Sequence, residues 1–170
     1  ATRFTRSKDT LMIKYILSSL LLLMLVTSAK AEEERTCLVE AVYFEARSET
    51  FAGKLAVANV ILERMYDKTF PNSVCEVVKQ GMYWEGNPVR NKCQFSYWCD
   101  GKTERMRNIK ALEEVVKVVN MALDGVLLRD TLGATHYHAV YVSPKWAMAD
   151  NFFLLAVVGE HVFYRRELCC

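Results

Sequence analysis

The sequence predicts a single domain of the α+β class, mainly helical with a small antiparallel sheet. Apolar residues recur at helical spacing through most of the chain, and segments rich in β-branched and aromatic residues follow position 135. The length of 170 residues suits one domain. We expect that domain over residues 36–166, after an N-terminal segment 1–31 and a linker 32–35, and before a tail 167–170.

The N-terminal segment has the layout of a secretory signal peptide. Basic residues lie at or before the start of an apolar run over 13–28, and Ala29-Lys30-Ala31 ends it with a small-x-small pattern. The alternative is an uncleaved membrane anchor, but the run is shorter than the roughly 20 residues that a spanning helix needs. Cleavage after Ala31 predicts an exported protein of the periplasm or cell wall, without a stable membrane partner.

The charge balance excludes a class of partner. Removing residues 1–31 takes away five of the 22 basic and one of the 20 acidic residues, which leaves 17 and 19 and a net charge of −2. Nucleic-acid binding calls for a clustered basic face, and none is evident. We therefore expect no nucleic-acid partner.

All six cysteines follow the predicted cleavage site. An even number in an exported chain indicates disulfides. Cys93 and Cys99 could close one loop, and Cys37 with Cys75 would join the first and third helices, although sequence leaves the pairing open. The adjacent Cys169-Cys170 lies in the tail.

Four helices are predicted. Thr36 is a candidate N-cap for a helix over 37–47. Periodic apolar residues predict further helices over 51–65, 71–80 and 108–124. The last has the clearest stripe, made of Ile109, Leu112, Val116, Val119 and Leu123.

The other segments are less regular. Residues 82–100 lack periodicity and are rich in aromatic residues, which predicts a long ordered loop of the kind that is often functional. The segments 135–142 and 154–164 are predicted to be strands.

The first predicted helix carries acids on its apolar stripe. Leu38 and Val42 share one face with Glu45 and Glu49, at helical spacing. An acid on a core-facing stripe is costly unless it is paired or functional, and burial raises its pKa. A carboxyl that stays protonated near neutral pH is the general acid that glycosidic cleavage needs.

The simpler interpretation is a salt bridge at the end of the helix. Either acid could pair with a nearby cation, namely Arg47, Lys54 or Arg64. The pattern alone favours this structural role.

The same region resembles the opening signature of the SleB/CwlJ-type cell wall hydrolases. That signature is an E-A-R-x-E segment (45–49), a linker with Gly53, and an apolar helix that ends at Arg64. Further segments similar to the family follow in order over 37–164: Phe70-Pro71-Asn72, Gln94-Phe95-Ser96, Gly133-Ala134-Thr135-His136-Tyr137, Pro144-Lys145-Trp146 and Gly159-Glu160-His161-Val162-Phe163. Ser48 stands where glycine is common, and Glu160 where a small or amide residue is common.

The resemblance implies a lysozyme-like fold and cleavage of the β-1,4 bond between N-acetylmuramic acid and N-acetylglucosamine in peptidoglycan. It assigns the catalytic acid to Glu45. Some members are lytic transglycosylases, which use one carboxyl, whereas a hydrolase normally needs a second carboxylate. Glu49 is the candidate second acid, or a structural residue that fixes the loop before Gly53. We expect no cofactor and no metal.

Substrate-binding residues follow from the same segments. Gln94, Ser96 and Thr135 could bind sugar hydroxyl or acetamido groups, and Tyr137 could lie near Glu45. Stacking on sugar rings is expected of aromatic residues, with four candidates: Trp84, Tyr97, Trp98 and Trp146.

Three other interpretations are open. His136, His138 and His161 could form a three-histidine zinc site of a wall amidase. The chain could instead bind peptidoglycan without cleaving it. A Cys-His nucleophile is the weakest, because no cysteine has an evident activating context.

Overall fold

A computed structural model describes the backbone of residues 5–167 and the side chains of Tyr15, Met24 and residues 26–167. The chain divides into two compact units, Ala1–Glu34 and Arg35–Cys170. Across the described part, no helix combines the length and apolar character needed to cross a bilayer. Most side chains of the apolar run 13–28 lie outside the described residues, as do Cys169 and Cys170.

The first helix starts far before the predicted N-cap. Helix α1 is Thr5–Ala46, so Thr36 and the expected linker 32–35 lie within it. The prediction of a helix start at residue 37 was therefore wrong. The physical reason is that Ala, Lys, Glu and Arg dominate residues 29–35, all good helix formers, and no Gly or Pro interrupts them.

The next three helices lie close to their predicted positions. They are α2 Phe51–Tyr66, α3 Val74–Val78 and α4 Ile109–Leu123. Each is capped by the residue before it, and the side chain of that cap accepts a backbone N–H from the first turn. These caps are Thr50, Ser73 and Asn108.

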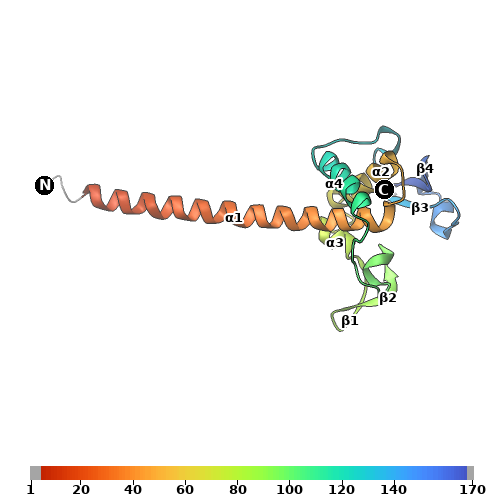
Figure 1. Ribbon diagram of the computed structural model, residues 1–170, viewed down its shortest axis with the longest axis horizontal. Coiled ribbons are helices and arrows are strands. Elements are labelled where there is room, and N and C mark those ends of the chain that lie inside the picture. Colours follow the sequence, from red (N-terminus) through yellow and green to blue (C-terminus); the bar gives the residue numbers. More distant parts are fainter. Residues whose placement is uncertain (1–4, 168–170) are drawn as a thin grey trace. The chain divides into compact units, whose positions relative to one another are not determined.

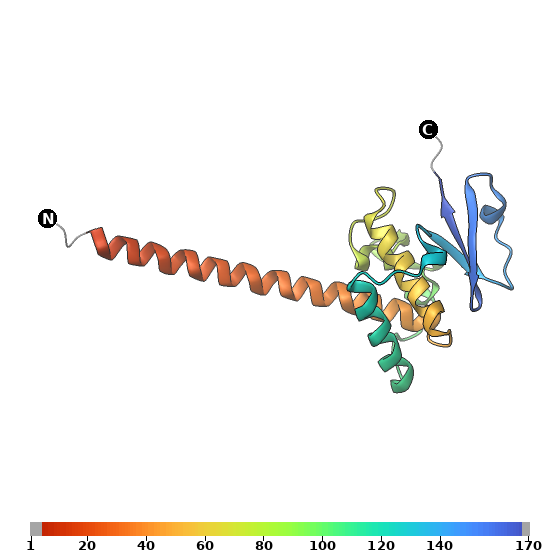
Figure 2. The same ribbon diagram turned by 90° about the horizontal axis from the view of Figure 1, so that it is seen from above.

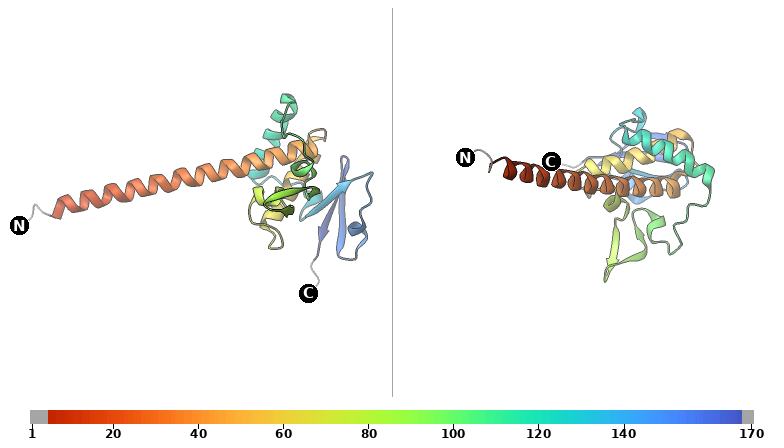
Figure 3. Two further views of the ribbon diagram at one scale, coloured as in Figure 1. Left: turned by 90° about the horizontal axis from the view of Figure 1, so that it is seen from below. Right: turned by 60° about the vertical axis from the view of Figure 1, so that its left-hand side comes forward.

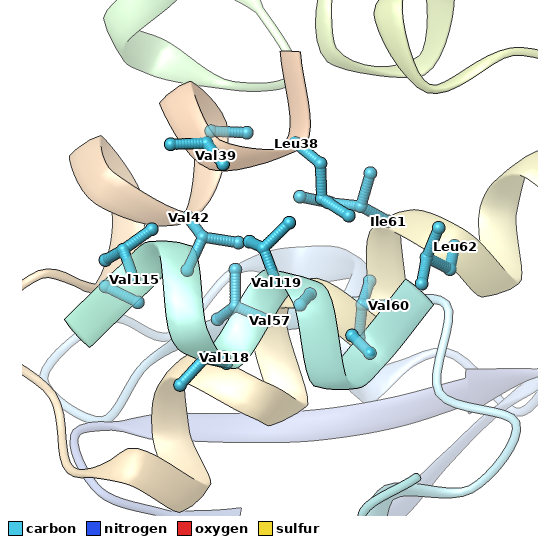
Figure 4. Packing of buried hydrophobic residues seen from close by; sticks show 14 of the residues in the cluster. Leu38, Val39, Val42, Val57, Val60, Ile61, Leu62, Val115, Val118 and Val119 are labelled. Carbon is cyan, nitrogen blue, oxygen red and sulfur yellow. The ribbon is translucent and has the colours of Figure 1, made fainter. Parts of the chain in front are cut away.

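The core is built where the end of α1 meets α2 and α4. Figure 4 shows Val42 of α1, Val57 of α2 and Val119 of α4 pointing into one cluster, and all three are fully buried. The face that α4 buries differs from the predicted stripe. Ile109 and Leu123 are exposed, whereas the buried residues are Ala111, Val115, Val118, Val119 and Ala122. Because valines lie on two adjacent stripes of α4, the predicted face and the buried face are nearly equally apolar, and the sequence does not distinguish them.

A three-stranded antiparallel sheet follows α4. Its order is β3 (His136–Ala139), β5 (His161–Arg166), β4 (Phe152–Val158). Residues 154–164, predicted as one strand, instead form parts of β4 and β5, joined by a turn at Gly159-Glu160. Gly159 has φ +58°, the left-handed conformation that a tight hairpin turn requires of its first residue.

Residues 82–100, predicted to be a loop, contain a second hairpin. Strands β1 (Gly81–Trp84) and β2 (Asn87–Cys93) pair antiparallel, and a 3-10 helix η1 (Ser96–Cys99) follows. The hairpin was hidden in the sequence because both its faces are largely exposed, which leaves no apolar alternation. Its one signal was Glu85-Gly86, whose φ values are both positive, as in a type I′ turn.

Both suggested disulfides are present. Cys37–Cys75 joins α1 to α3, and Cys93–Cys99 joins β2 to η1. Within residues 35–167, Figures 1 and 2 show the α-helices grouped on one side of the β3–β5–β4 sheet. The further views of Figure 3 show the β1–β2 hairpin standing apart from that sheet.

Candidate active site

A cleft of about 520 Å³ lies between the C-terminal end of α1, α2, η1 and the edge strand β3. Its walls are mainly aromatic rings, imidazoles and polar side chains. They belong to Phe44, Glu45, Arg64, Gln94, Phe95, Ser96, His136, Tyr137, His138, Ala139, Tyr141, Val142, Trp146 and His161. Glu45 is the one carboxylate among these lining residues.

Glu45 lies in the last turn of α1, where the predicted stripe reaches the cleft. Leu38 and Val42 on that stripe are fully buried, so the helix face that fills the core also brings the acid inward. Burial raises the pKa of Glu45 to about 7, against the smaller opposing effects of a Tyr137 hydrogen bond and the Arg64 charge. The Tyr137 hydroxyl donates to Glu45 Oε2 at 3.3 Å. Glu45 is thus a carboxyl that exchanges a proton near neutral pH.

The expected salt bridge of Glu45 is not formed. In the described part of the chain, no cation lies within 4.0 Å of its oxygens. Arg64 is directed elsewhere, since its Nε donates to the Thr135 carbonyl oxygen at 2.7 Å and its guanidinium lies 5.2 Å from the Phe70 ring centre. Arg64 acts on Glu45 only through space.

Arg64 is a cleft residue that the sequence argument treated only as a salt-bridge partner. It is 6% exposed, and burial lowers its pKa. A signal was present, because Val57, Ile61 and Arg64 repeat the spacing of Leu38, Val42 and Glu45. On both α1 and α2, the charged residue that ends the apolar stripe lines the cleft, namely Glu45 and Arg64.

The sheet presents Tyr137 to the acid. Tyr137 pairs with Phe163 in the β3–β5 ladder, so the two residues share the inner face. The Tyr137 ring lies edge-on to that of His161, with centres 5.2 Å apart. Burial and the neighbouring Glu45 raise the pKa of Tyr137, which therefore keeps its proton as a hydrogen-bond donor.

Glu49 lies in a different environment. It follows the end of α1, and its side chain is 6% exposed. Its Oε2 accepts the Glu160 N–H at 3.1 Å, and its Oε1 lies 3.5 Å from His161 Nδ1. Both carboxylate oxygens thus contact the β4–β5 turn, and Glu49 does not line the cleft.

Two glycines make room for the Glu49 carboxylate. A Cβ at Gly159 would lie 1.9 Å from Glu49 Oε2, and one at Gly53 would lie 2.9 Å from the same atom. Gly53 lies in the first turn of α2, and Gly159 begins the β4–β5 hairpin turn. The glycines of two separate sequence motifs therefore meet at one side chain.

Four of the five predicted substrate-binding residues line the cleft. They are Gln94, Ser96, Tyr137 and Trp146. Thr135 does not. Its side chain is buried, and its Oγ1 lies 2.9 Å from His136 Nδ1 and accepts the Arg166 N–H at 3.4 Å. Thr135 instead orients a histidine that does line the cleft.

The other stacking candidates lie elsewhere. Trp84 is 72% exposed on β1, and the Trp98 Nε1 donates to the Tyr83 hydroxyl at 3.0 Å. Tyr97 is buried and stacks on Phe44 with ring centres 4.9 Å apart. Of the four aromatic candidates, only Trp146 lines the cleft that holds Glu45.

The strand register separates the three histidines. His136 and His138 lie on the outer face with Trp146, whereas His161 pairs with Ala139 and lies on the inner face with Tyr137. Within residues 5–167, no three His, Cys, Asp or Glu side chains are grouped as metal ligands would be. The donor set for a three-histidine zinc site is therefore not assembled.

The chain is similar to known proteins in both sequence and structure. Residues 48–164 match the Cell Wall Hydrolase family. The spore cortex-lytic enzyme of Bacillus subtilis (strain 168) is 35% identical over 83 residues, which is 49% of this chain and 24% of that protein. The spore cortex-lytic enzyme of Halalkalibacterium halodurans is 40% identical over 53 residues, 31% of this chain and 16% of that protein. The chain thus matches a quarter or less of the length of these relatives.

Two solved structures share the fold. The catalytic domain of the germination-specific lytic transglycosylase SleB from Bacillus anthracis is 27% identical, with a TM-score of 0.59, over 78% of this chain and 93% of that one. The catalytic domain of the Bacillus cereus SleB protein is 26% identical, with a TM-score of 0.55, over 79% and 91%. The predicted α+β, lysozyme-like fold is confirmed. Because the family match covers residues 48–164, well over half of its length, this chain belongs to the Cell Wall Hydrolase family.

Proposed function

We propose that this chain cleaves the β-1,4 glycosidic bond between N-acetylmuramic acid and N-acetylglucosamine in peptidoglycan, with Glu45 as general acid and base. The observation that carries the proposal is Glu45 itself. It is a half-buried carboxyl in a cleft of suitable size, and burial raises its pKa to about 7. A carboxyl with such a pKa donates a proton to a leaving oxygen and accepts one back at neutral pH.

The presence of one carboxylate in the cleft favours lytic transglycosylation over hydrolysis. A hydrolase normally needs a second carboxylate at about 5–10 Å as a nucleophile or water-activating base. Glu49 is the nearest acid in sequence, but its oxygens contact the β4–β5 turn. We therefore assign Glu49 a structural role.

The proposed reaction has two proton transfers. Glu45 first protonates the glycosidic oxygen as the bond to C1 breaks. The resulting carboxylate then takes the proton of the muramic C6 hydroxyl, whose oxygen forms the new bond to C1. The products are a free N-acetylglucosamine end and a 1,6-anhydro-muramic end, and Glu45 regains its proton. The Tyr137 hydroxyl stabilises the carboxylate between the two steps.

Binding would use the residues around the acid. Gln94 and Ser96 supply polar groups on one wall, and Trp146 supplies an apolar ring for a sugar face. The two disulfides suit an oxidising compartment, which supports a periplasmic or cell-wall location.

The test compares two isosteric substitutions on purified peptidoglycan sacculi, with released fragments identified by mass spectrometry. Glu45→Gln is expected to lower the rate by about 10²–10⁴-fold, because it removes the titratable proton. Glu49→Gln, the matched control, is expected to retain most activity under conditions in which it is folded. Anhydro-muramic ends in the wild-type digest would support transglycosylation, and reducing ends would mean hydrolysis.

Two outcomes would overturn the proposal. Equal release by wild type and Glu45→Gln would remove Glu45 from the chemistry. Binding of sacculi by both proteins without any release would support a non-catalytic wall-binding role.

A further inference from the structure

A second cavity adjoins the cleft. It measures about 260 Å³ and shares two lining residues, Phe44 and Ser96, with the Glu45 cleft. The remaining lining comes from Arg47 and from the segment between Tyr97 and Glu104. We call this space the side cavity. Because the Phe44 and Ser96 side chains border both spaces, the side cavity lies directly beside the cleft.

The side cavity differs from the cleft in its charges. Its walls hold two cations, Arg47 and Lys102, and two acids, Asp100 and Glu104. Lys102 and Asp100 neutralise one another, with Nζ and Oδ2 3.4 Å apart. That leaves one charge of each sign for a ligand.

The remaining charges are available. The Arg47 guanidinium lies 5.4 Å from the Tyr43 ring centre, and within residues 26–167 neither Arg47 nor Glu104 lies in an ion pair. The buried Tyr97 hydroxyl also has no hydrogen-bond partner among the described residues. The cavity thus offers a cationic site, an anionic site and a polar wall.

The position of Arg47 ties this cavity to the reaction. Arg47 follows Glu45 by two residues at the end of α1, so their Cα atoms are roughly 5–6 Å apart. Residues two apart on a helix point to different sides, so Arg47 faces the side cavity while Glu45 faces the cleft. A group bound to Arg47 is therefore a substituent on a sugar in the adjoining cleft rather than the cleaved bond itself. The muramic acid at the cleaved bond carries such a substituent, since its C3 lactyl group is joined to a stem peptide. That peptide carries free carboxylates and, at its diamino acid, an ammonium group.

We propose that the side cavity binds the stem peptide of the muramic acid next to the cleaved bond, with Arg47 on a peptide carboxylate and Glu104 on its ammonium group. This inference rests on the proposed glycosidic function. With this site, the enzyme recognises the stem peptide as well as the glycan strand. Mixed charge in the side cavity matches a zwitterionic peptide, whereas the aromatic and polar walls of the cleft match the sugars.

The test uses two forms of one substrate: intact sacculi, and sacculi whose stem peptides have been removed by an amidase. The measured quantity is the ratio of cleavage rates on the intact and the peptide-free glycan. Arg47→Gln is expected to lower this ratio by about ten-fold or more, the effect of losing a hydrogen bond to a charged group. Glu104→Gln should lower the ratio in the same direction. Arg107→Gln, an exposed substitution outside both cavities, should keep the wild-type ratio.

The outcomes separate the two proposals. An unchanged ratio in both Arg47→Gln and Glu104→Gln, with wild type active on both substrates, would overturn the side-cavity assignment alone. Wild type that cleaves neither substrate would overturn the glycosidic function and this inference with it. Glu45→Gln should lower both rates together, because it acts on the bond and not on the peptide.

Discussion

Glu45 and Glu49 are four residues apart, yet the structure gives them opposite surroundings. Glu45 faces a cleft, receives one hydrogen bond from a tyrosine and has a pKa raised to about 7 by burial. Glu49 is directed into the β4–β5 turn, where a backbone N–H and a histidine contact its two oxygens. Glu45, which has no charged partner among the described residues, can exchange a proton with a bound substrate, whereas Glu49 uses its fixed contacts to position the β4–β5 turn. The same residue type thus serves two tasks because its neighbours differ.

The largest expected effect is on the pH dependence of stability. The pKa of Glu45 is about 7 in the folded chain and near 4.5 when unfolded, so the folded state keeps this proton to higher pH. Stability from this group is fully present below pH 4.5 and is lost as the pH rises to 7. The loss is at most about 3 kcal/mol. Glu45→Gln removes the titration, so the variant should be more stable than wild type at pH 8 and equal to it at pH 4.

Urea unfolding at both pH values measures this difference. Other titrating groups act in both proteins, including His161, whose pKa burial lowers, so they cancel in the comparison. Equal pH slopes in wild type and Glu45→Gln would mean that Glu45 titrates normally.

The second prediction concerns the space that Glu49 occupies. Gly159→Ala adds a Cβ 1.9 Å from Glu49 Oε2 at a residue with φ +58°. We expect a loss of roughly 1–3 kcal/mol in the free energy of unfolding, from backbone strain and displacement of the carboxylate. Thermal or urea unfolding measures it.

Gly86→Ala is the matched control. Gly86 also lies in a hairpin turn with positive φ, but a Cβ there meets nothing within 4 Å. The loss in the free energy of unfolding caused by Gly86→Ala should therefore come from backbone strain alone. In a Glu49→Ala background the costs of the two alanine substitutions should converge. If Gly159→Ala still destabilises the Glu49→Ala protein more than Gly86→Ala does, by the same difference as in wild type, the Glu49 side chain does not fill the space beside Gly159.

The same comparison shows where sequence reasoning succeeded. The apolar stripe of α1 located Glu45, since burial of Leu38 and Val42 fixes which face turns inward. The segments α2, α3 and α4 were predicted from helical periodicity, which is a local property. The contacts of Glu49 could not be predicted from local sequence, because its partners lie more than a hundred positions away in the chain. No local pattern states which turn will pack against which acid.

The errors have physical causes of the same kind. The β1–β2 hairpin lacks a buried face, so its strands show no alternation of apolar and polar residues. Only the Glu85-Gly86 turn indicates the hairpin in the sequence. Thr135 was assigned to substrate from a motif, but its hydroxyl is used within the sheet beside His136. Membership in a segment predicts that a residue is near the cleft, and only tertiary structure says which way its side chain points.

The smallest expected effect refines the description of Glu45. The Tyr137 hydroxyl donates to Glu45 and so lowers its pKa, against the stronger effect of burial. Tyr137→Phe removes that donor, and the pKa of Glu45 should rise further, by up to about one unit for a neutral hydrogen bond. Since Glu45 must be protonated to act, activity falls above its pKa, and this alkaline limb of the rate profile should move to higher pH.

The measurement is the pH profile of glycan cleavage, with Tyr66→Phe as the control. Tyr66 is an exposed tyrosine that lines neither the cleft nor the side cavity, so removal of its hydroxyl should leave the alkaline limb in place. A limb that moves to lower pH in Tyr137→Phe would mean that the hydroxyl stabilises the protonated acid instead. The protonated form of Glu45 would then be favoured by a hydrogen bond as well as by burial.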